Sequence, residues 1–122
     1  MSCIVIIGAG MMGSAMSMPA RDREHEVRIM GTPLDRDIIV HAQETGRHLS
    51  MNRALPEGVL FCQFSEAESA LAGVDLVICG VSSFGVDWFA REAVPLIPDG
   101  VPVLMVTKGL LNHPDGSLEA FP

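Results

Sequence analysis

The sequence predicts an α/β fold, a doubly wound parallel sheet with helices on both faces. Apolar, β-branched runs alternate along the chain with helix-like segments, and the joints between them are short. The runs are apolar throughout, which is typical of parallel strands buried on both faces. At 122 residues the chain has the length of one domain. We place this domain at residues 1–111, and residues 112–122 begin a further element.

Each element is predicted from its own residues. Five strands are expected, at Cys3–Ile7, Val27–Met30, Val59–Cys62 as an edge strand, Val74–Val81 and Val101–Val106. Helices are expected at Ser14–Ala20, ended or kinked by Pro19, at Asp35–Thr45, after Ser65, and at Phe84–Val94. Ser65 and Glu68 have the spacing of a capping box. Residues 46–58 form the longest predicted loop.

Composition excludes several classes of function. The net charge of −7 disfavours nucleic acid as a partner. No apolar stretch approaches the roughly 18 residues that a membrane span needs. Cys3, Cys62 and Cys79 lack metal-ligand spacing, so we expect reduced thiols, no metal site and a cytoplasmic protein. The four histidines, His25, His41, His48 and His113, share no metal or triad spacing and are expected to be mostly exposed.

The strongest functional signal is a glycine loop. Gly8, Gly10 and Gly13 form G-x-G-x-x-G directly after the first strand and at the start of a helix. In this context the first glycine permits a tight turn, the second lets the backbone approach a pyrophosphate, and the third lets helix and strand pack. The pattern favours a Rossmann-type dinucleotide site. The alternative is a glycine turn that merely joins strand to helix.

The end of the second strand bears on the choice between NAD and NADP. An acidic residue there would hold the ribose 2′-hydroxyl of NAD, but the position falls at Gly31 and Thr32. Asp35 lies further on, and Arg36 beside it could meet a 2′-phosphate. This favours NADP or use of both cofactors. Asp35 and Asp37 are equally explained as first-turn residues that complement the helix dipole.

Two further strands end at the same rim of the sheet, where such folds bind ligands. Ser82 and Ser83 follow the fourth strand, and we expect them to cap the next helix, to line the cofactor site, or both. Lys108, the single lysine of the sequence, follows the fifth strand. Its ammonium group could neutralise a substrate phosphate or stabilise a developing negative charge.

Three segments carry a family resemblance: residues 8–15 (GAGMMGSA), residues 26–32 (EVRIMGT) and residues 103–110 (VLMVTKGL). Their sequences and spacing resemble the NAD(P)-dependent glycerol-3-phosphate dehydrogenases, and residues 14–19 and 31–39 look closest to archaeal-type members. Departures are Met30 where tryptophan is usual, Ser82–Ser83 where the family has proline and serine, and Arg23–Glu24–His25 where a glycine is expected.

The resemblance implies an oxidoreductase of glycerophospholipid metabolism that interconverts dihydroxyacetone phosphate and glycerol 3-phosphate with NAD or NADP. It assigns cofactor contacts to Met11 and Met12 through their backbone, to Thr32, and to Lys108, which also serves catalysis. Family members carry a second, helical substrate domain, so residues 112–122 would begin the connection to it. The chain by itself would then be inactive. A homodimer is the candidate assembly.

Two other readings remain open. One is another hydroxyacid or ketoacid reductase of the same superfamily, such as a ketopantoate or 6-phosphogluconate type, although Thr107–Lys108–Gly109 argues against it. The other is a stand-alone NAD(P)-binding sensor module, which would bind tightly and signal through a partner.

Overall fold

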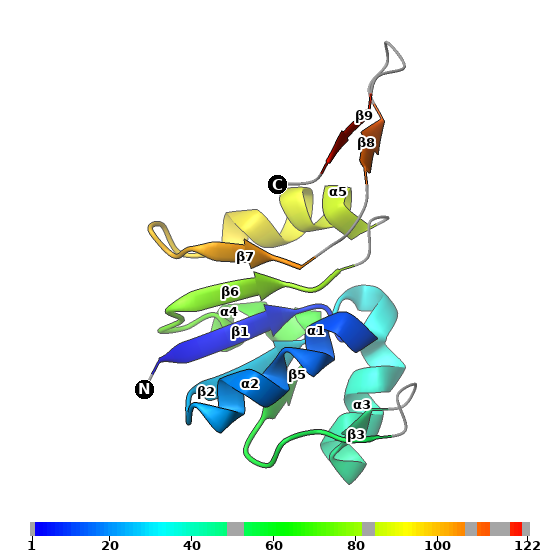
Figure 1. The fold of residues 1–122 in the computed structure, drawn as a ribbon, viewed down its shortest axis with the longest axis vertical. Coiled ribbons are helices and arrows are strands. Elements are labelled where there is room, and N and C mark those ends of the chain that lie inside the picture. The colour runs from blue at the N-terminus through cyan, green and yellow to red at the C-terminus, as the bar shows by residue number, and fades with distance from the viewer. Residues whose placement is uncertain (1, 49–52, 82–84, 107–109, 113–117, 121–122) are drawn as a thin grey trace.

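The computed structural model describes residues 2–48, 53–81, 85–106, 110–112 and 118–120. Its main sheet contains five parallel strands, β1 (Cys3–Ile7), β2 (Glu26–Met30), β5 (Leu60–Cys62), β6 (Leu76–Cys79) and β7 (Val103–Met105). They lie side by side in the order β5-β2-β1-β6-β7 (Figure 1). The chain runs outward from β1 to β5 and then crosses to the other side of β1. This is the strand order of a Rossmann-type sheet, so the predicted fold class is confirmed.

The five predicted strands are all present, and β5 lies at an edge as expected. β1 has the predicted bounds, whereas β6 is shorter than the predicted Val74–Val81. Its pairing nevertheless continues past both ends, because Asp75 N donates to Cys3 O and Gly80 N donates to Ile7 O, each at 2.8 Å. The apolar run therefore predicts the position of the strand correctly, but it predicts bounds that are two residues too long at each end.

The helices are α1 (Met11–Ala15), α2 (Ser17–Asp22), α3 (Arg36–Thr45), α4 (Ala67–Ala70) and α5 (Val86–Trp88). Residues 11–22 thus form two short helices that meet at Met16, where a single helix over Ser14–Ala20 was predicted. Pro19 does not end the second of them. It occupies the first turn of α2, where its missing N–H is not needed, and the break lies before it because proline cannot bond to the carbonyl of Ala15.

The predicted start of α3 agrees with the structure, whereas the predicted start of α4 does not. α3 is preceded by a 3₁₀ turn, η1 (Pro33–Asp35), so the helical segment agrees closely with the predicted Asp35–Thr45. α4 is preceded by η2 (Phe64–Glu66), and here the predicted Ser65–Glu68 capping box is wrong. The carboxylate that reaches back is that of Glu66, which accepts from Gln63 N at 3.0 Å. The helical segment begins two residues earlier than predicted, and the capping box is formed by Gln63 and Glu66.

The segment after β6 is helical but irregular. α5 continues into a π-helical stretch, η4 (Phe89–Ala93), and a 3₁₀ turn, η5 (Val94–Leu96). Pro95 has no N–H to donate to the carbonyl of Arg91, which accounts for the loss of regular α-helix before it. The predicted helix Phe84–Val94 is therefore present with a different hydrogen-bond pattern.

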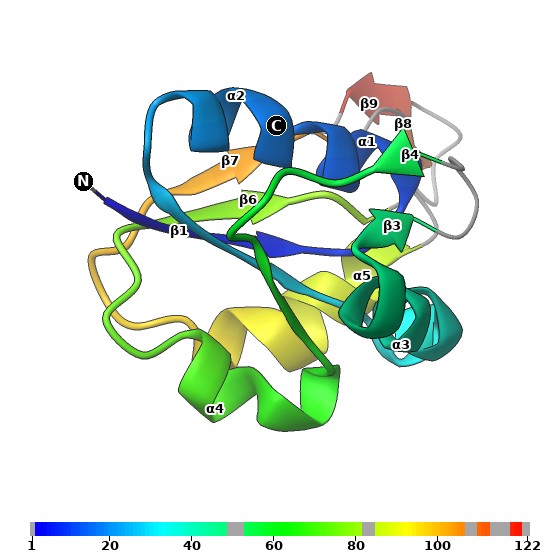
Figure 2. The same ribbon diagram turned by 90° about the horizontal axis from the view of Figure 1, so that it is seen from below.

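Two small antiparallel ribbons lie outside the main sheet. β3 (Arg47–His48) pairs with β4 (Arg53–Ala54) within the segment predicted to be a loop, and β8 (Leu110–Asn112) pairs with β9 (Leu118–Ala120). Gly46 ends α3 in the left-handed conformation, with φ of 71°. Its conformation reverses the chain, so that β3 returns beside α3 (Figure 2).

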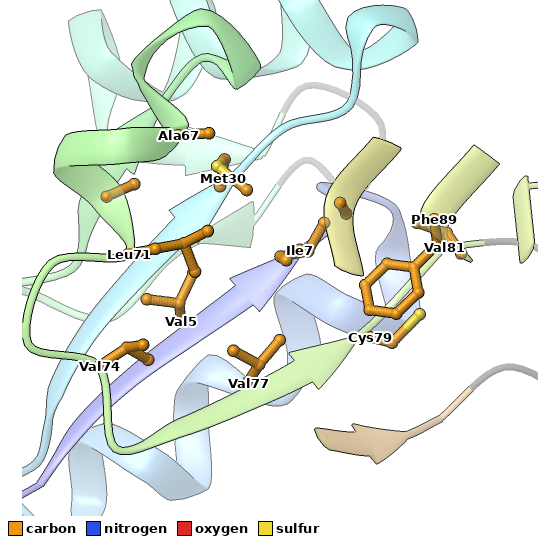
Figure 3. Close-up of a cluster of buried hydrophobic side chains, with 12 residues drawn as sticks. Val5, Ile7, Met30, Ala67, Leu71, Val74, Val77, Cys79, Val81 and Phe89 are labelled. Carbon is orange, nitrogen blue, oxygen red and sulfur yellow. The ribbon is translucent and has the colours of Figure 1, made fainter. Parts of the chain in front are cut away.

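The core lies on both faces of the sheet. α2 covers one face, and α4 and α5 cover the other (Figure 2). Ile4 and Ile6 belong to the cluster that includes residues of α2 and α3. Val5 and Ile7 belong to the cluster of Figure 3, which packs β1, β2 and β6 against α4 and η4. Alternate residues of β1 thus enter opposite cores, as a parallel central strand requires.

Candidate functional site

The glycine loop follows β1 at the centre of the sheet. Gly8 adopts φ of +107°, a conformation that side chains rarely take, and its N–H donates to Met30 O at 2.8 Å. A Cβ on Gly8 would lie 2.9 Å from Gly80 C, and one on Gly13 would lie 2.6 Å from Gly8 O. Both positions need glycine for the fold itself, because the loop, α1 and the end of β6 are in backbone contact.

Gly10 differs from these two glycines. A Cβ built there meets no atom closer than Gly80 O at 4.0 Å, and the backbone has no positive φ. Neither packing nor conformation therefore requires glycine at this position. The space that a side chain would fill is open, which is what a pyrophosphate in close contact with the backbone would need.

A cavity of about 440 Å³ lies beside this loop. Its wall is formed by residues that follow β1, β2 and β6, together with the residue before α5 and the last residue of α5: Gly8, Gly10, Thr32, Pro33, Leu34, Asp35, Gly80, Val81, Gly85 and Trp88. The cavity is thus at the carboxyl ends of the strands, next to the switch point between β1 and β6 where the strand order reverses. This is the usual ligand position in this fold. Its volume is within the range of small-molecule sites.

Asp35 connects two parts of the cavity wall. Its Oδ2 accepts hydrogen bonds from Ala9 N at 3.0 Å, Thr32 N at 2.9 Å and Thr32 Oγ1 at 3.0 Å. Thr32 in turn caps the 3₁₀ turn, since its Oγ1 accepts from Leu34 N at 3.3 Å. The carboxylate therefore joins the glycine loop to the end of β2.

The expectation that the histidines are mostly exposed is wrong for His48. This side chain is 1% exposed, and its Nε2 lies 2.6 Å from Ala9 O. Because a carbonyl oxygen only accepts, Nε2 carries the hydrogen and donates. His25 and His41 are half-buried, and His113 lies outside the described residues.

The predicted site residues fall into three groups. Gly8, Gly10 and Thr32 come together in the cavity wall, whereas Gly13 packs α1 against β1 and β6. Met11 and Met12 are the first two residues of α1, where backbone N–H groups have no partner within the helix. Ser82, Ser83 and Lys108 lie outside the described residues.

Sequence reasoning missed several residues of the wall. Gly80 was read as part of a strand, yet a Cβ on it would lie 2.7 Å from Gly13 Cα. Leu34 and Trp88 line the cavity, and Trp88 packs edge-on against Phe64 with ring centroids 4.9 Å apart. Pro33 also borders a second cavity of about 270 Å³, which includes Arg36 and Gln63. A glycine directly after an apolar run was the one local signal that could have found Gly80.

The thiols lie away from the cavity wall. Cys3 and Cys79 are buried and Cys62 is half-buried. Burial raises the pKa of the Cys3 and Cys62 thiols. Within the described ranges, no three His, Cys, Asp or Glu side chains lie together as metal ligands. No helix in that part of the chain is long and apolar enough to cross a membrane.

Comparison with known proteins agrees with this geometry. Residues 3–120 match the family model described as NAD-dependent glycerol-3-phosphate dehydrogenase N-terminus. The chain is 33% identical to an NADP(+)-dependent glycerol-3-phosphate dehydrogenase of Archaeoglobus fulgidus, over 98% of its own length and 35% of the relative. It is 30% identical to a glycerol-3-phosphate dehydrogenase [NAD(P)+] of Shouchella clausii, over 90% of this chain and 32% of that one.

A solved structure is similar over the same region. The crystal structure of glycerol-3-phosphate dehydrogenase from Coxiella burnetii superposes with a TM-score of 0.77 at 26% identity, covering 89% of this chain and 33% of that one. The chain thus spans about a third of the length of these relatives. Sequence and structure agree, and the chain belongs to the NAD-dependent glycerol-3-phosphate dehydrogenase family, whose amino-terminal part it matches.

Proposed function

We propose that the chain is the cofactor domain of a glycerol-3-phosphate dehydrogenase and binds NAD or NADP on its glycine loop. The observation that carries this proposal is the open space at Gly10, beside a cavity at the carboxyl ends of the strands. A structural turn would need glycine at Gly8 and Gly13 but not at Gly10. The free N–H groups at the start of α1 would bind the pyrophosphate together with the loop backbone.

The rest of the cofactor fits the neighbouring wall. Leu34 is 96% exposed and offers an apolar surface for the adenine ring. Thr32 lies where the adenosine ribose would be held. Arg36, exposed in the adjacent second cavity, could pair with a 2′-phosphate, which supports use of NADP as well as NAD.

The reaction itself would need more than the described residues. When bound, the cofactor supplies or accepts hydride as dihydroxyacetone phosphate and glycerol 3-phosphate interconvert. Lys108 would neutralise negative charge on the substrate, and Ser82 and Ser83 would line the cofactor beside it. We place the cofactor domain at residues 1–111, with residues 112–122 leading to a helical substrate domain. The whole enzyme would be a cytoplasmic homodimer that acts in glycerophospholipid metabolism. The exposed apolar side chains of Val103 and Leu104 support a covering partner at the β7 edge.

The first test is a titration of the chain with NADH and NADPH. Trp88 is the single tryptophan of the sequence and lines the cavity, so its fluorescence should change on binding, and calorimetry gives an independent affinity. The variant Gly10→Val should lose binding while remaining folded. The exposed Ala72→Val is the matched control and should bind as the parent does. A folded parent chain that binds neither nucleotide would contradict the proposal.

A further inference from the structure

One residue of the glycine loop, Ala9, has both its backbone N–H and its backbone C=O hydrogen-bonded to distant side chains. Its N–H donates to Asp35 Oδ2 at 3.0 Å. Its carbonyl accepts from His48 Nε2 at 2.6 Å and from Ser14 Oγ at 3.3 Å. Asp35 is 26 residues away from Ala9 in sequence and His48 is 39 residues away. Tertiary structure, rather than the local turn, therefore fixes the backbone at Ala9.

The two side chains come from the two flanks of α3. Asp35 directly precedes the helix, and His48 follows it after the reversal at Gly46, on β3. Leu55 N donates to Gly46 O at 2.8 Å, which ties the returning β3–β4 ribbon to the end of the helix. α3 and its flanks therefore hold Ala9 from outside the β1–α1 unit that carries the glycine motif.

Such a restraint matters because of the neighbours of Ala9. Gly8 and Gly10 flank it, and glycine loses more conformational freedom on ordering than any other residue. A Gly-Ala-Gly segment without restraints would be a poor pre-formed anion site, since ordering it on binding weakens affinity. Ala9 itself is 1% exposed and directs both polar groups into the protein. Asp35 and His48 therefore add side-chain restraints to the backbone bonds from Gly8 N to Met30 O and from Ser14 N to Gly10 O.

Building on the proposed function, we propose that Asp35 and His48 are positioning residues that hold the peptide groups on either side of Ala9 and so keep the glycine loop in the shape that receives the pyrophosphate. Asp35 acts as an acceptor and His48 as a donor. Neither role needs contact with the cofactor. Asp35 Oδ2 accepts from Ala9 N and twice from Thr32, so this oxygen serves the wall of the site.

The test uses paired variants of the chain. Asp35→Ala and His48→Ala remove the hydrogen bonds, whereas Asp35→Asn keeps an acceptor and His48→Gln keeps a donor. We expect NADH and NADPH to bind about ten-fold or more weakly to the alanine variants. A hydrogen bond to the charged Asp35 contributes on this scale, and loss of His48 removes a donor from the buried carbonyl of Ala9, which costs a similar amount. The conservative variants should stay within about three-fold of the parent. Asp37→Ala, at an exposed acid in the first turn of the same helix, is the control and should not change affinity.

A second measurement separates positioning from general stability. Amide hydrogen exchange of Ala9 should become at least about ten-fold faster in Asp35→Ala, while the amides of β1 keep their protection. If His48→Ala does not fold, His48→Phe fills the same buried space without a donor and should show the same weakening. Alanine variants that bind like the parent, with Ala9 exchange unchanged, would overturn the positioning role alone. A folded parent that binds neither NADH nor NADPH would overturn the proposed function and this role with it.

Discussion

β1 and β7 are built from similar apolar residues, yet the two strands have different surroundings. Every residue of β1 is buried, and Val5, Ile6 and Ile7 are completely inaccessible. In β7, Val103 is 38% exposed and Leu104 is 46% exposed. An apolar run therefore specifies a strand, but its burial depends on what covers it. The cofactor loop lies on the covered strand, and the open edge lies two strands away.

The largest expected effect comes from truncating one apolar side chain in each strand. Ile6→Ala should lower the free energy of unfolding by about 2–5 kcal/mol, because a fully buried branched side chain leaves a cavity. Leu104→Ala should cost about 1 kcal/mol or less, because the side chain is already half in water. Urea unfolding of both variants gives the two values.

Protein concentration sharpens this comparison. If Leu104→Ala costs as much as Ile6→Ala, and more so at high concentration, then a second copy covers the β7 edge. A cost that is small at every concentration would leave this edge exposed in solution.

The glycines of the loop provide the next comparison, between folding and binding. Gly13→Ala should destabilise by about 1–3 kcal/mol, since its Cβ would meet Gly8 O at 2.6 Å and the backbone must shift. Gly10→Ala should change stability by no more than about 0.5 kcal/mol while weakening NADH binding at least about ten-fold. Thermal unfolding and calorimetry on the same samples measure both. Equal stability losses would show that Gly10 is also structural.

These contrasts show which parts of the site could be predicted from the sequence. Gly8, Gly10 and Gly13 were found because their chemistry is local: a strand, a turn and a helix start occupy consecutive residues. The positions of Asp35 and His48 depend on how α3 and β3 pack on the loop. No spacing in the sequence contains that information, so His48 was read as a surface residue.

The fold followed the same rule. The strands and their doubly wound parallel arrangement were predictable because parallel α/β chains have few allowed connections. Helix ends were less predictable, since two proline effects and two candidate capping boxes compete locally. The prediction that Pro19 ends or kinks its helix near the last turn is wrong, because α2 continues to Asp22. The break instead lies before Pro19, at Met16, since Pro19 has no N–H to donate to the carbonyl of Ala15.

A strained turn before β2 gives a smaller effect of opposite sign. Glu24 has φ of 62°, at the point where the family resemblance leads one to expect a glycine. Since a left-handed conformation costs a side-chain-bearing residue about 1–2 kcal/mol, Glu24→Gly should raise stability by about 1 kcal/mol. Glu24→Ala, which removes the charge but keeps the strain, is the control. Thermal unfolding should place Glu24→Gly alone above the parent, and a parallel rise in Glu24→Ala would instead point to charge.

The smallest expected effect concerns the thiol of Cys62, on the edge strand β5 at the opposite side of the sheet from β7. Burial raises the pKa of the Cys62 thiol above its ordinary value of 9.0, Glu66 raises it further, and Arg28 opposes the shift. Only the thiolate is alkylated, so iodoacetamide should react slowly at pH 7 and faster as the pH rises past 9.

The neutral thiol is favoured in the folded state, so its contribution to stability is complete below the pKa of the unfolded chain and is lost as the pH rises through the folded pKa. Cys62→Ser should remove the labelling that increases above pH 9 and flatten this alkaline decline in stability. Rapid labelling at pH 7 would contradict this prediction and would mean that Cys62 is exposed in solution, as the side chains of β7 are.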